Sequence, residues 1–325
     1  MSNPRAVISR LLAVLVALAF VPAAPAQDAF PGARPIQFVV LFPAGTSADV
    51  TARVLAEGMG RQLGTQIVVV NRPGGGGAVG LKYAAQQAPD GHQMVWSSNA
   101  ISTTYHTGML PFDYTSFQPV ARVQIETPFV FVRGESPWKT LPDLLRQAKS
   151  KPGALTVGNS GFGSHTHLSS VWLFKASGLE VVDVPFNAAQ VVPSLVGGHV
   201  DAVVQLPGAL AGLVKSGTVR ALVALSGARD PFLPDVPTAR EQGMNLSAEL
   251  WRGVAVPKGT PAHVVARLED AIRRTVASPE FRRATEKLLV APAFLPASEF
   301  GKAIAREDAE IGRTVKALGI RQDSR

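Results

Sequence analysis

Apolar runs of strand length alternate with amphipathic segments of helical length in the N-terminal third of the chain. The apolar runs fall at residues 36–41, 66–70 and 93–96, and the helical segments fall between them at 48–63 and 78–87. Short apolar strands that are separated by helices predict parallel β-α-β units, with helices on both faces of the sheet.

A second series of the same kind follows. Its expected strands are short and rich in valine, at residues 129–132, 155–157, 181–184, 200–204 and 219–225. After the first of these, Thr140 and Asp143 have the spacing of a capping box at the start of a helix that ends near Lys149. Two such series in one chain predict an α/β protein with two lobes of similar architecture.

The C-terminal part is mostly helical. Thr260 and Ser278 each precede a proline, which is the arrangement of an N-cap before a proline at the first helical position, and Ser298 starts a third helix. A strand at residues 251–256 precedes these helices. We expect the three helices to return and cover the first lobe, beyond an ordered proline-rich connector at residues 229–237.

The first 26 residues have the pattern of a signal peptide. Arg5 and Arg10 supply positive charge, and Ala24-Pro25-Ala26 fits a cleavage site. The apolar run between them, residues 11–19, is shorter than the roughly 20 residues that a membrane-spanning helix needs. We therefore expect export as a soluble protein, with cleavage near Ala26.

Composition narrows the chemistry. The chain has 325 residues, a formal net charge of +8 and no cysteine. The length suits about two domains of roughly 100–200 residues each. Without cysteine, a disulfide scaffold, thiol catalysis and thiolate metal sites are excluded, so the hydrophobic core alone must hold the fold. The basic residues are scattered and form no stripe with aromatic residues, so nucleic acid is not an expected partner.

Three loops each follow an expected strand and open an expected helix, at residues 42–49, 158–165 and 185–189. The second contains three glycines and two serines, which suit a ligand cradle. The first, taken alone, is typical of an ordinary capped helix. Helix N-termini attract anions, and ligands of open α/β sheets bind beyond the carboxyl ends of the strands. We therefore expect a small anion in a cleft where the three loops meet.

Three motifs suggest other chemistries. Residues 75–80 match G-x-G-x-x-G, but the acidic residue expected about 20 positions later is missing, and we interpret these glycines as a tight turn near the cleft. His165 and His167 are metal-binding residue types, but their spacing points them to different faces of a helix. Ser160 and Ser164 lack the G-x-S-x-G elbow of a hydrolase. We expect no cofactor, no metal and no catalytic residue.

Several short motifs follow one another along the expected mature chain. They stand at residues 34–36, 42–49, 70–74 with the glycine run that follows, 89–91, 117–120, 158–164, 184–186, 197–201, 233–238 and 257–261. Their joint order and spacing resemble the Bug-type periplasmic solute-binding proteins of tripartite tricarboxylate transporters. The resemblance implies a periplasmic Venus flytrap with two crossovers, in which each lobe is a mostly parallel sheet flanked by helices. It implies a first lobe of residues 27–124 and 238–325 and a second lobe of residues 125–237.

The resemblance also implies a monomer that binds a small carboxylate, of the dicarboxylate, tricarboxylate, acidic amino acid or aromatic acid class. The implied ligand-binding residues are Gly45, Thr46, Ser47, Asp49, Ser97, Ser98 and Asn99 in the first lobe, and Ser160, Gly161, Gly163, Ser164, His165, Pro185, Phe186, Asn187 and Asp201 in the second. Thr46 and Ala188 stand where the family usually has glycine, and Phe186 replaces the usual tyrosine. These departures predict a reshaped pocket.

Three functions fit these features. The first is a transport receptor whose closed form docks on membrane permease subunits, and this is the function we expect. The second is a signalling receptor that presents the same closed form to a sensor protein. The third is a secreted hydrolase that uses Ser160 or Ser164, against which the missing elbow argues.

Overall fold

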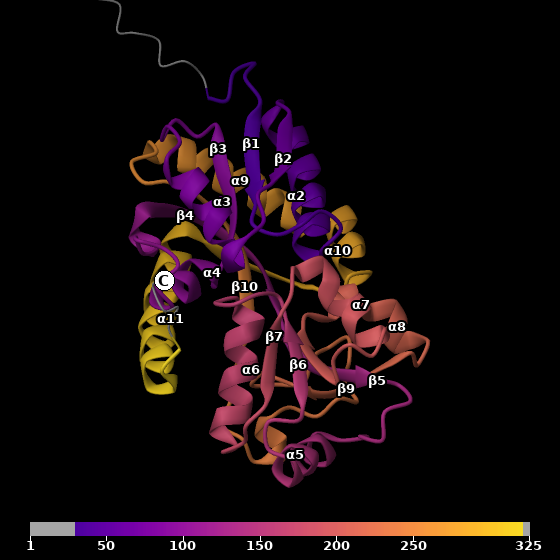
Figure 1. Ribbon diagram of the computed structural model, residues 1–325. Helices are drawn as coiled ribbons and strands as arrows, with labels where there is room; N and C mark the ends of the chain where they lie inside the picture. The colour runs from indigo at the N-terminus through magenta and orange to yellow at the C-terminus, as the bar shows by residue number, and fades with distance from the viewer. Residues whose placement is uncertain (1–29, 321–325) are drawn as a thin grey trace, which may run out of the picture.

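The computed structural model describes residues 30–320, which form two lobes, each built on one β-sheet (Figure 1). The predicted signal peptide and its cleavage site lie outside the described residues. Among residues 30–320, no helix combines the length and the apolar character needed to cross a bilayer.

The first sheet has six strands in the order β11-β4-β10-β3-β1-β2. The strands are β1 (Ile36–Val40), β2 (Ile67–Asn71), β3 (Gln93–Ser98), β4 (Phe117–Glu126), β10 (Leu250–Pro257) and β11 (Ala291–Pro296). Strand β1 pairs in parallel with β2 and β3, whereas β10 runs antiparallel to β3 and β4. This register places Arg252 of β10 directly beside Ser98 of β3 and beside Gln124 of β4.

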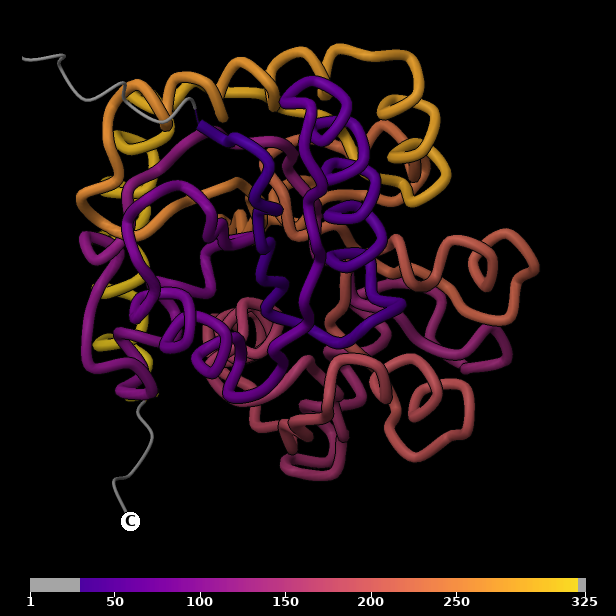
Figure 2. The backbone as a smooth tube through the Cα atoms, turned by 90° about the horizontal axis from the view of Figure 1, so that it is seen from above, coloured from indigo at the N-terminus to yellow at the C-terminus, as the bar shows by residue number. Residues whose placement is uncertain are grey.

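Helices cover both faces of the first sheet. One face packs against α2 (Ser47–Leu63), α9 (Ala262–Ala277) and α10 (Pro279–Glu286), which lie side by side in Figures 1 and 2. The other face packs against α3 (Ala78–Ala85), α4 (Ala100–His106) and α11 (Ala297–Leu318). Helix α2 ends as predicted, because Gly64 adopts the left-handed conformation and donates its N–H to Gly60.

The second sheet has five strands in the order β7-β6-β8-β5-β9. The strands are β5 (Phe129–Arg133), β6 (Thr156–Asn159), β7 (Val182–Pro185), β8 (Ala202–Gln205) and β9 (Val219–Ala224), and the helices are α5 (Leu141–Ser150), α6 (His165–Ala176), α7 (Val191–Val196) and α8 (Ala211–Lys215). The capping box predicted at Thr140 and Asp143 is present at the start of α5. Short 3-10 turns lie at Gly75–Gly77, Tyr114–Ser116, Ala188–Gln190, Pro207–Ala209 and Arg240–Gln242.

Both sheets are mixed, but most strands of each sheet run in one direction, as expected. Parallel pairing is confined to β2-β1-β3 in the first sheet and to β7-β6-β8 in the second. The remaining pairs are antiparallel because β10 and β11 run opposite to the other four strands of the first sheet, and β5 runs opposite to the other four strands of the second. Strands β4 and β10 are also the strands through which the chain leaves and re-enters the first lobe.

The return to the first lobe was expected at residue 238, and the residues just after this position pack in the second lobe. Ala239, Leu246 and Ala248 all pack in a hydrophobic cluster of the second lobe, and β10 begins at Leu250. We therefore propose that the second lobe extends to about residue 248. On the outgoing side, β4 ends at Glu126 and β5 begins at Phe129, close to the expected boundary.

Helix α11 contacts both lobes, although it was expected to cover the first alone. Phe300 and Ile304, near its start, pack in the core of the first lobe. At its other end, Ile311 and Val315 pack against Leu168 and Val171 of α6, with which α11 lies alongside in Figure 1. The last helix therefore bridges the lobes in addition to the two crossover strands.

Candidate ligand-binding cleft

Two helices, one from each lobe, begin at the same small cavity. Helix α2 follows β1 through the loop at residues 41–46, and helix α6 follows β6 through the loop at residues 160–164. Thr46 is the N-cap of α2 and accepts from the N–H of Asp49, while Ser164 is the N-cap of α6 and accepts from the N–H of His167. Serine and threonine are among the residue types that are favoured at the N-cap of a helix.

Each of these helices has two unpaired N–H groups in its first turn, because such groups lack an intrahelical acceptor. Within residues 30–320, no hydrogen bond involves the N–H groups of Ser47 and Ala48 in α2 or of His165 and Thr166 in α6. All four residues line the same cavity. The lobes contribute equally to these four donors and two positive helix ends, which are features that favour an anion.

The cavity lies between the lobes and has a volume of about 50 Å³. It is lined by Phe42, Thr46, Ser47, Ala48, Leu250 and Arg252 from the first lobe and the re-entering strand, and by Ser160, Ser164, His165, Thr166, Ala188, Gln205, Leu206 and Ala209 from the second lobe. The polar groups come mainly from loops and helix ends, and the apolar groups fill the gaps between them.

The lobes touch beside this cavity. A Cβ atom built on Gly76 would lie 2.9 Å from the carbonyl oxygen of Phe162, and one built on Gly208 would lie 2.8 Å from the carbonyl oxygen of Leu288. Each of these contacts joins a glycine of one lobe to the backbone of the other, so the lobes are in close contact here. The glycines at residues 75–77 form a turn with positive φ at this contact.

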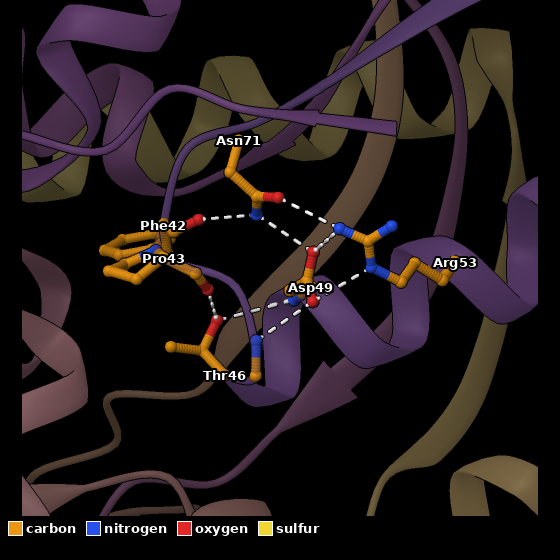
Figure 3. Close-up of polar contacts among 7 residues, drawn as sticks. Phe42, Pro43, Thr46, Asp49, Arg53 and Asn71 are labelled. Atoms are coloured by element: carbon orange, nitrogen blue, oxygen red, sulfur yellow. Dashed lines mark hydrogen bonds and ion pairs between the residues drawn. The ribbon is translucent and has the colours of Figure 1, made fainter. Parts of the chain in front are cut away.

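Asp49 organises the loop that leads into α2 (Figure 3). Its carboxylate accepts from the N–H of Gly45 at 3.0 Å and from the side chain of Asn71 at 2.9 Å, and it pairs with Arg53 at 2.9 Å. Burial raises the pKa of Asp49, but these hydrogen bonds and the charge of Arg53 outweigh it and hold the pKa below its ordinary value. Asp49 does not line the cavity, and its contacts hold the loop in place.

A buried ion pair joins the two crossover strands at the cavity. Arg252 Nε donates to Glu126 Oε2 at 2.5 Å, and their side chains are 4% and 0% exposed. Ser47 Oγ donates to the other oxygen, Glu126 Oε1, at 2.7 Å. Glu126 therefore has a partner on each oxygen, as a buried carboxylate requires.

In the second lobe, Ser160 is held from two directions. Its N–H donates to Thr166 Oγ1 at 3.0 Å, and its Oγ accepts from Gln205 Nε2 at 3.1 Å. Because the Oγ of Ser160 accepts from Gln205, its own O–H is available to donate to a ligand.

The two histidines of α6 each form a hydrogen bond with a backbone group. His165 Nε2 lies 2.6 Å from the carbonyl oxygen of Ala248, and His167 Nδ1 accepts from the N–H of Gly163 at 3.2 Å. Burial lowers the pKa of each histidine to about 4, so both are neutral at pH 7. Neither ring hydrogen-bonds a serine hydroxyl, so the described residues contain no Ser-His pair of a hydrolase at this site.

Five of the predicted site residues line the cavity, namely Thr46, Ser47, Ser160, Ser164 and His165. Gly45, Gly161 and Gly163 shape the two loops but do not line it, and each has a positive φ that favours glycine.

The serines and asparagine after β3 are not at the cavity. Ser97 faces a groove on the other side of the first sheet, and Ser98 accepts from the N–H of Ala100 at the start of α4. Asn99 accepts from the N–H of Trp251 at 3.0 Å and donates to Glu307 of α11. The side chains of Ser98 and Asn99 thus hydrogen-bond within the protein, and the role of these three residues in ligand binding stays a prediction.

Four predicted residues of the second lobe also lie elsewhere. Phe186 packs in a hydrophobic cluster and against Gly158, while Pro185 and Asn187 are outside the cavity lining. Asp201 accepts from the backbone N–H and the hydroxyl of Thr156, at 2.9 and 2.8 Å. Thr156 begins β6 and the cavity lies beyond its other end, so Asp201 braces the far side of the lobe.

The cavity also contains residues that sequence reasoning missed. Gln205 ends the buried strand β8. The turn after it leads from a strand to a helix, as do the three loops that the sequence singled out. Arg252 is a lone basic residue within the apolar run 250–257, which is a signal of a buried, paired charge. Thr166 and Ala48 contribute their backbone N–H groups, which leave no mark in the sequence.

Among residues 30–320, no group of three His, Asp or Glu side chains is placed to hold a metal ion. His165 and His167 in particular have separate backbone partners.

Both the sequence and the fold are similar to those of known proteins. Residues 51–320 match the Tripartite tricarboxylate transporter family receptor, TctC. The fold is similar to that of the periplasmic binding protein BugD, with 28% identity, a TM-score of 0.83, and 89% of this chain and 98% of BugD covered.

Two similar solved structures contain a ligand. MatC from Rhodopseudomonas palustris, with bound malate, is 27% identical with a TM-score of 0.81, over 87% of this chain and 99% of MatC. An R. palustris protein with adipate is 26% identical with a TM-score of 0.83, over 89% of this chain and 98% of that protein. With two sheets, two crossovers and a match over most of its length, the chain belongs to the TctC/Bug family of solute-binding receptors of tripartite tricarboxylate transporters.

Proposed function

We propose that the protein captures a small carboxylate in the periplasm, between the starts of α2 and α6, and delivers it to a tripartite tricarboxylate-type permease. The observation that carries this proposal is the set of four unpaired N–H groups of Ser47, Ala48, His165 and Thr166, two from each lobe, around one cavity. A carboxylate bound there contacts both lobes only when they are closed. It therefore favours the closed state by its difference in affinity for the two states.

The malate and adipate found in the two similar structures support the carboxylate class. The charge balance of the cavity supports it too. Arg252 is paired with Glu126, His165 is neutral, and the remaining positive potential comes from the two helix ends. In this proposal, the closed form carries the cargo and is the state that docks on the permease.

The first experiment is a thermal-shift screen of carboxylates against the corresponding amides, which keep the shape but lack the charge. A carboxylate ligand at 100 times its Kd adds about 2.7 kcal/mol to the stability. The matched amide should give no shift. A shift with amides, sugars or amines but with no carboxylate would refute the proposed function.

The second experiment isolates the N–H donors. Ser47 is the first helical residue of α2, where proline is well tolerated. Ser47→Ala removes the hydroxyl alone, whereas Ser47→Pro removes the hydroxyl and the N–H. Because a hydrogen bond to a charged group is worth about 1.5–3 kcal/mol, Ser47→Pro should bind the carboxylate roughly 10- to 100-fold more weakly than Ser47→Ala. Equal affinities of the two variants would exclude this N–H as a ligand donor.

A further inference from the structure

The guanidinium of Arg252 is nearly buried and only partly used. Its side chain is 4% exposed, and it lines the interlobe cavity. Of its five N–H donors, only the one on Nε forms a hydrogen bond within residues 30–320, to Glu126. A nearly buried guanidinium whose Nη atoms are unpaired beside a cavity is a donor site for a ligand, because burying such donors without partners is costly.

The charge of Arg252 is already balanced. Glu126 Oε2 lies 2.5 Å from Arg252 Nε, so a ligand group at the Nη atoms meets an ion pair with no net charge. A second carboxylate placed there would also be repelled by Glu126. The Nη atoms therefore suit a neutral acceptor oxygen better than a second carboxylate.

Ser47 favours a ligand that also donates a hydrogen bond. Its Oγ gives its only proton to Glu126 Oε1 at 2.7 Å, so it presents lone pairs to the cavity that it also lines. A ligand hydroxyl satisfies both neighbours, since its oxygen accepts from Arg252 and its proton goes to Ser47. A ketone or an ether oxygen satisfies Arg252 alone.

The size of the cavity limits the rest of the ligand. The cavity has a volume of about 50 Å³, which favours a short ligand. Apolar side chains of Phe42, Leu206 and Leu250 line the remaining wall. This wall suits a short hydrocarbon stem between the carboxylate and the hydroxyl.

We propose that the cavity selects a short hydroxymonocarboxylate, whose carboxylate binds the helix N-termini and whose hydroxyl is read by Arg252 and Ser47. This inference rests on the proposed function and names its substrate class. Arg252 is the specificity-determining residue, and Glu126 is a positioning residue that orients the guanidinium through Nε.

The test compares lactate with propionate, which has the same stem and no hydroxyl, and with malate, which carries a second carboxylate. Calorimetric titration of the full mature protein should give at least about tenfold tighter binding of lactate than of propionate. In the paired variant Arg252→Gln with Glu126→Gln, which removes the ion pair without leaving an unpaired buried charge, this preference should fall below about threefold. The readout is the ratio of the two affinities within each protein, so a change in affinity that is common to lactate and propionate does not affect it.

The inference is overturned while the proposed function stands if propionate binds as tightly as lactate, or if malate binds more tightly than lactate, in the parent protein. A lactate preference that survives in the paired variant would exclude Arg252 as its source. If neither lactate nor propionate nor malate binds, whereas the carboxylate screen finds another ligand, the substrate class is wrong. If no carboxylate binds at all, the proposed function itself fails.

Discussion

A single methyl group at Gly76 should hold the lobes apart. Gly76 has φ of 61° in the 3-10 turn at Gly75–Gly77 of the first lobe. A Cβ atom there would lie 2.9 Å from Phe162 O and 3.0 Å from Ser164 N, both in the loop that leads into α6. These neighbours are backbone atoms, so they cannot rotate away as a flexible side chain could.

The magnitude of the Gly76→Ala effect separates into two parts. The left-handed backbone costs alanine about 1–2 kcal/mol in the open and the closed state alike. The overlap with the other lobe costs a further amount on the order of 1–3 kcal/mol, and only when the lobes are closed. Since 1.4 kcal/mol is tenfold in affinity, we expect the Kd for the best-binding carboxylate of the screen to rise roughly 5- to 100-fold.

Gly153→Ala is the matched control, because Gly153 has φ of 70° and no atom within 4 Å of its Cβ position. Both variants should lose similar thermal stability without ligand, but only Gly76→Ala should bind more weakly. X-ray scattering at saturating ligand should show a larger radius of gyration for Gly76→Ala than for the control. Equal Kd values and equal radii would refute the reasoning that this contact forms on closure.

Three further predictions concern stability. Asp201→Ala should lower the unfolding free energy by about 1–3 kcal/mol by leaving Thr156 unpaired, with ligand affinity unchanged; weaker binding with unchanged stability would contradict this structural role. Burial lowers the pKa of His167 from 6.5 to about 4, so between these pH values the unfolded chain binds more protons than the folded chain. His167 should therefore lower the free energy of unfolding by an amount on the order of 3 kcal/mol as the pH falls from 6.5 to 4. Urea unfolding of His167→Gln should show a shallower acid slope, and an unchanged slope would exclude His167. Burial raises the pKa of Glu307 from 4.5 to about 7, so between these pH values the folded chain binds more protons than the unfolded chain. The contribution of Glu307 to the free energy of unfolding is therefore lost as the pH rises from 4.5 to 7. Glu307→Gln should remove that loss, which denaturant midpoints at both pH values will measure.

Elements with a strong local pattern were predictable from the sequence. Helix α2 combines an N-cap at Thr46, an amphipathic face and Gly64, and the structure has it at Ser47–Leu63 against the expected 48–63. Strand β4 escaped prediction because polar residues and a proline interrupt its sequence, and tertiary packing decides its state. Strand β11 contains two prolines, which are tolerated because it lies at the edge of the sheet.

The residues of the candidate site also divide into those that a local sequence pattern indicates and those that only tertiary packing brings together. The starts of α2 and α6 carry serines, threonines and glycines, which are local signals of a cleft, and Ser47 and Ser160 line one cavity. Arg252 and Glu126 are 126 positions apart, and no local pattern indicates that they form an ion pair. Asn99 has the right residue type after a strand, yet its amide is occupied by Trp251 and Glu307 from distant parts of the chain.

The bridging position of α11 gives the molecule a built-in place for a reporter. Its first turns are anchored in one lobe, while Ile311 and Val315 rest on α6 of the other. Ala317 of α11 and Ala176 of α6 are both exposed, and the chain contains no cysteine that would compete for labelling. A fluorophore pair attached at Ala317→Cys and Ala176→Cys would change its energy transfer as the lobes move, which turns the receptor into a reagentless optical sensor for its own cargo.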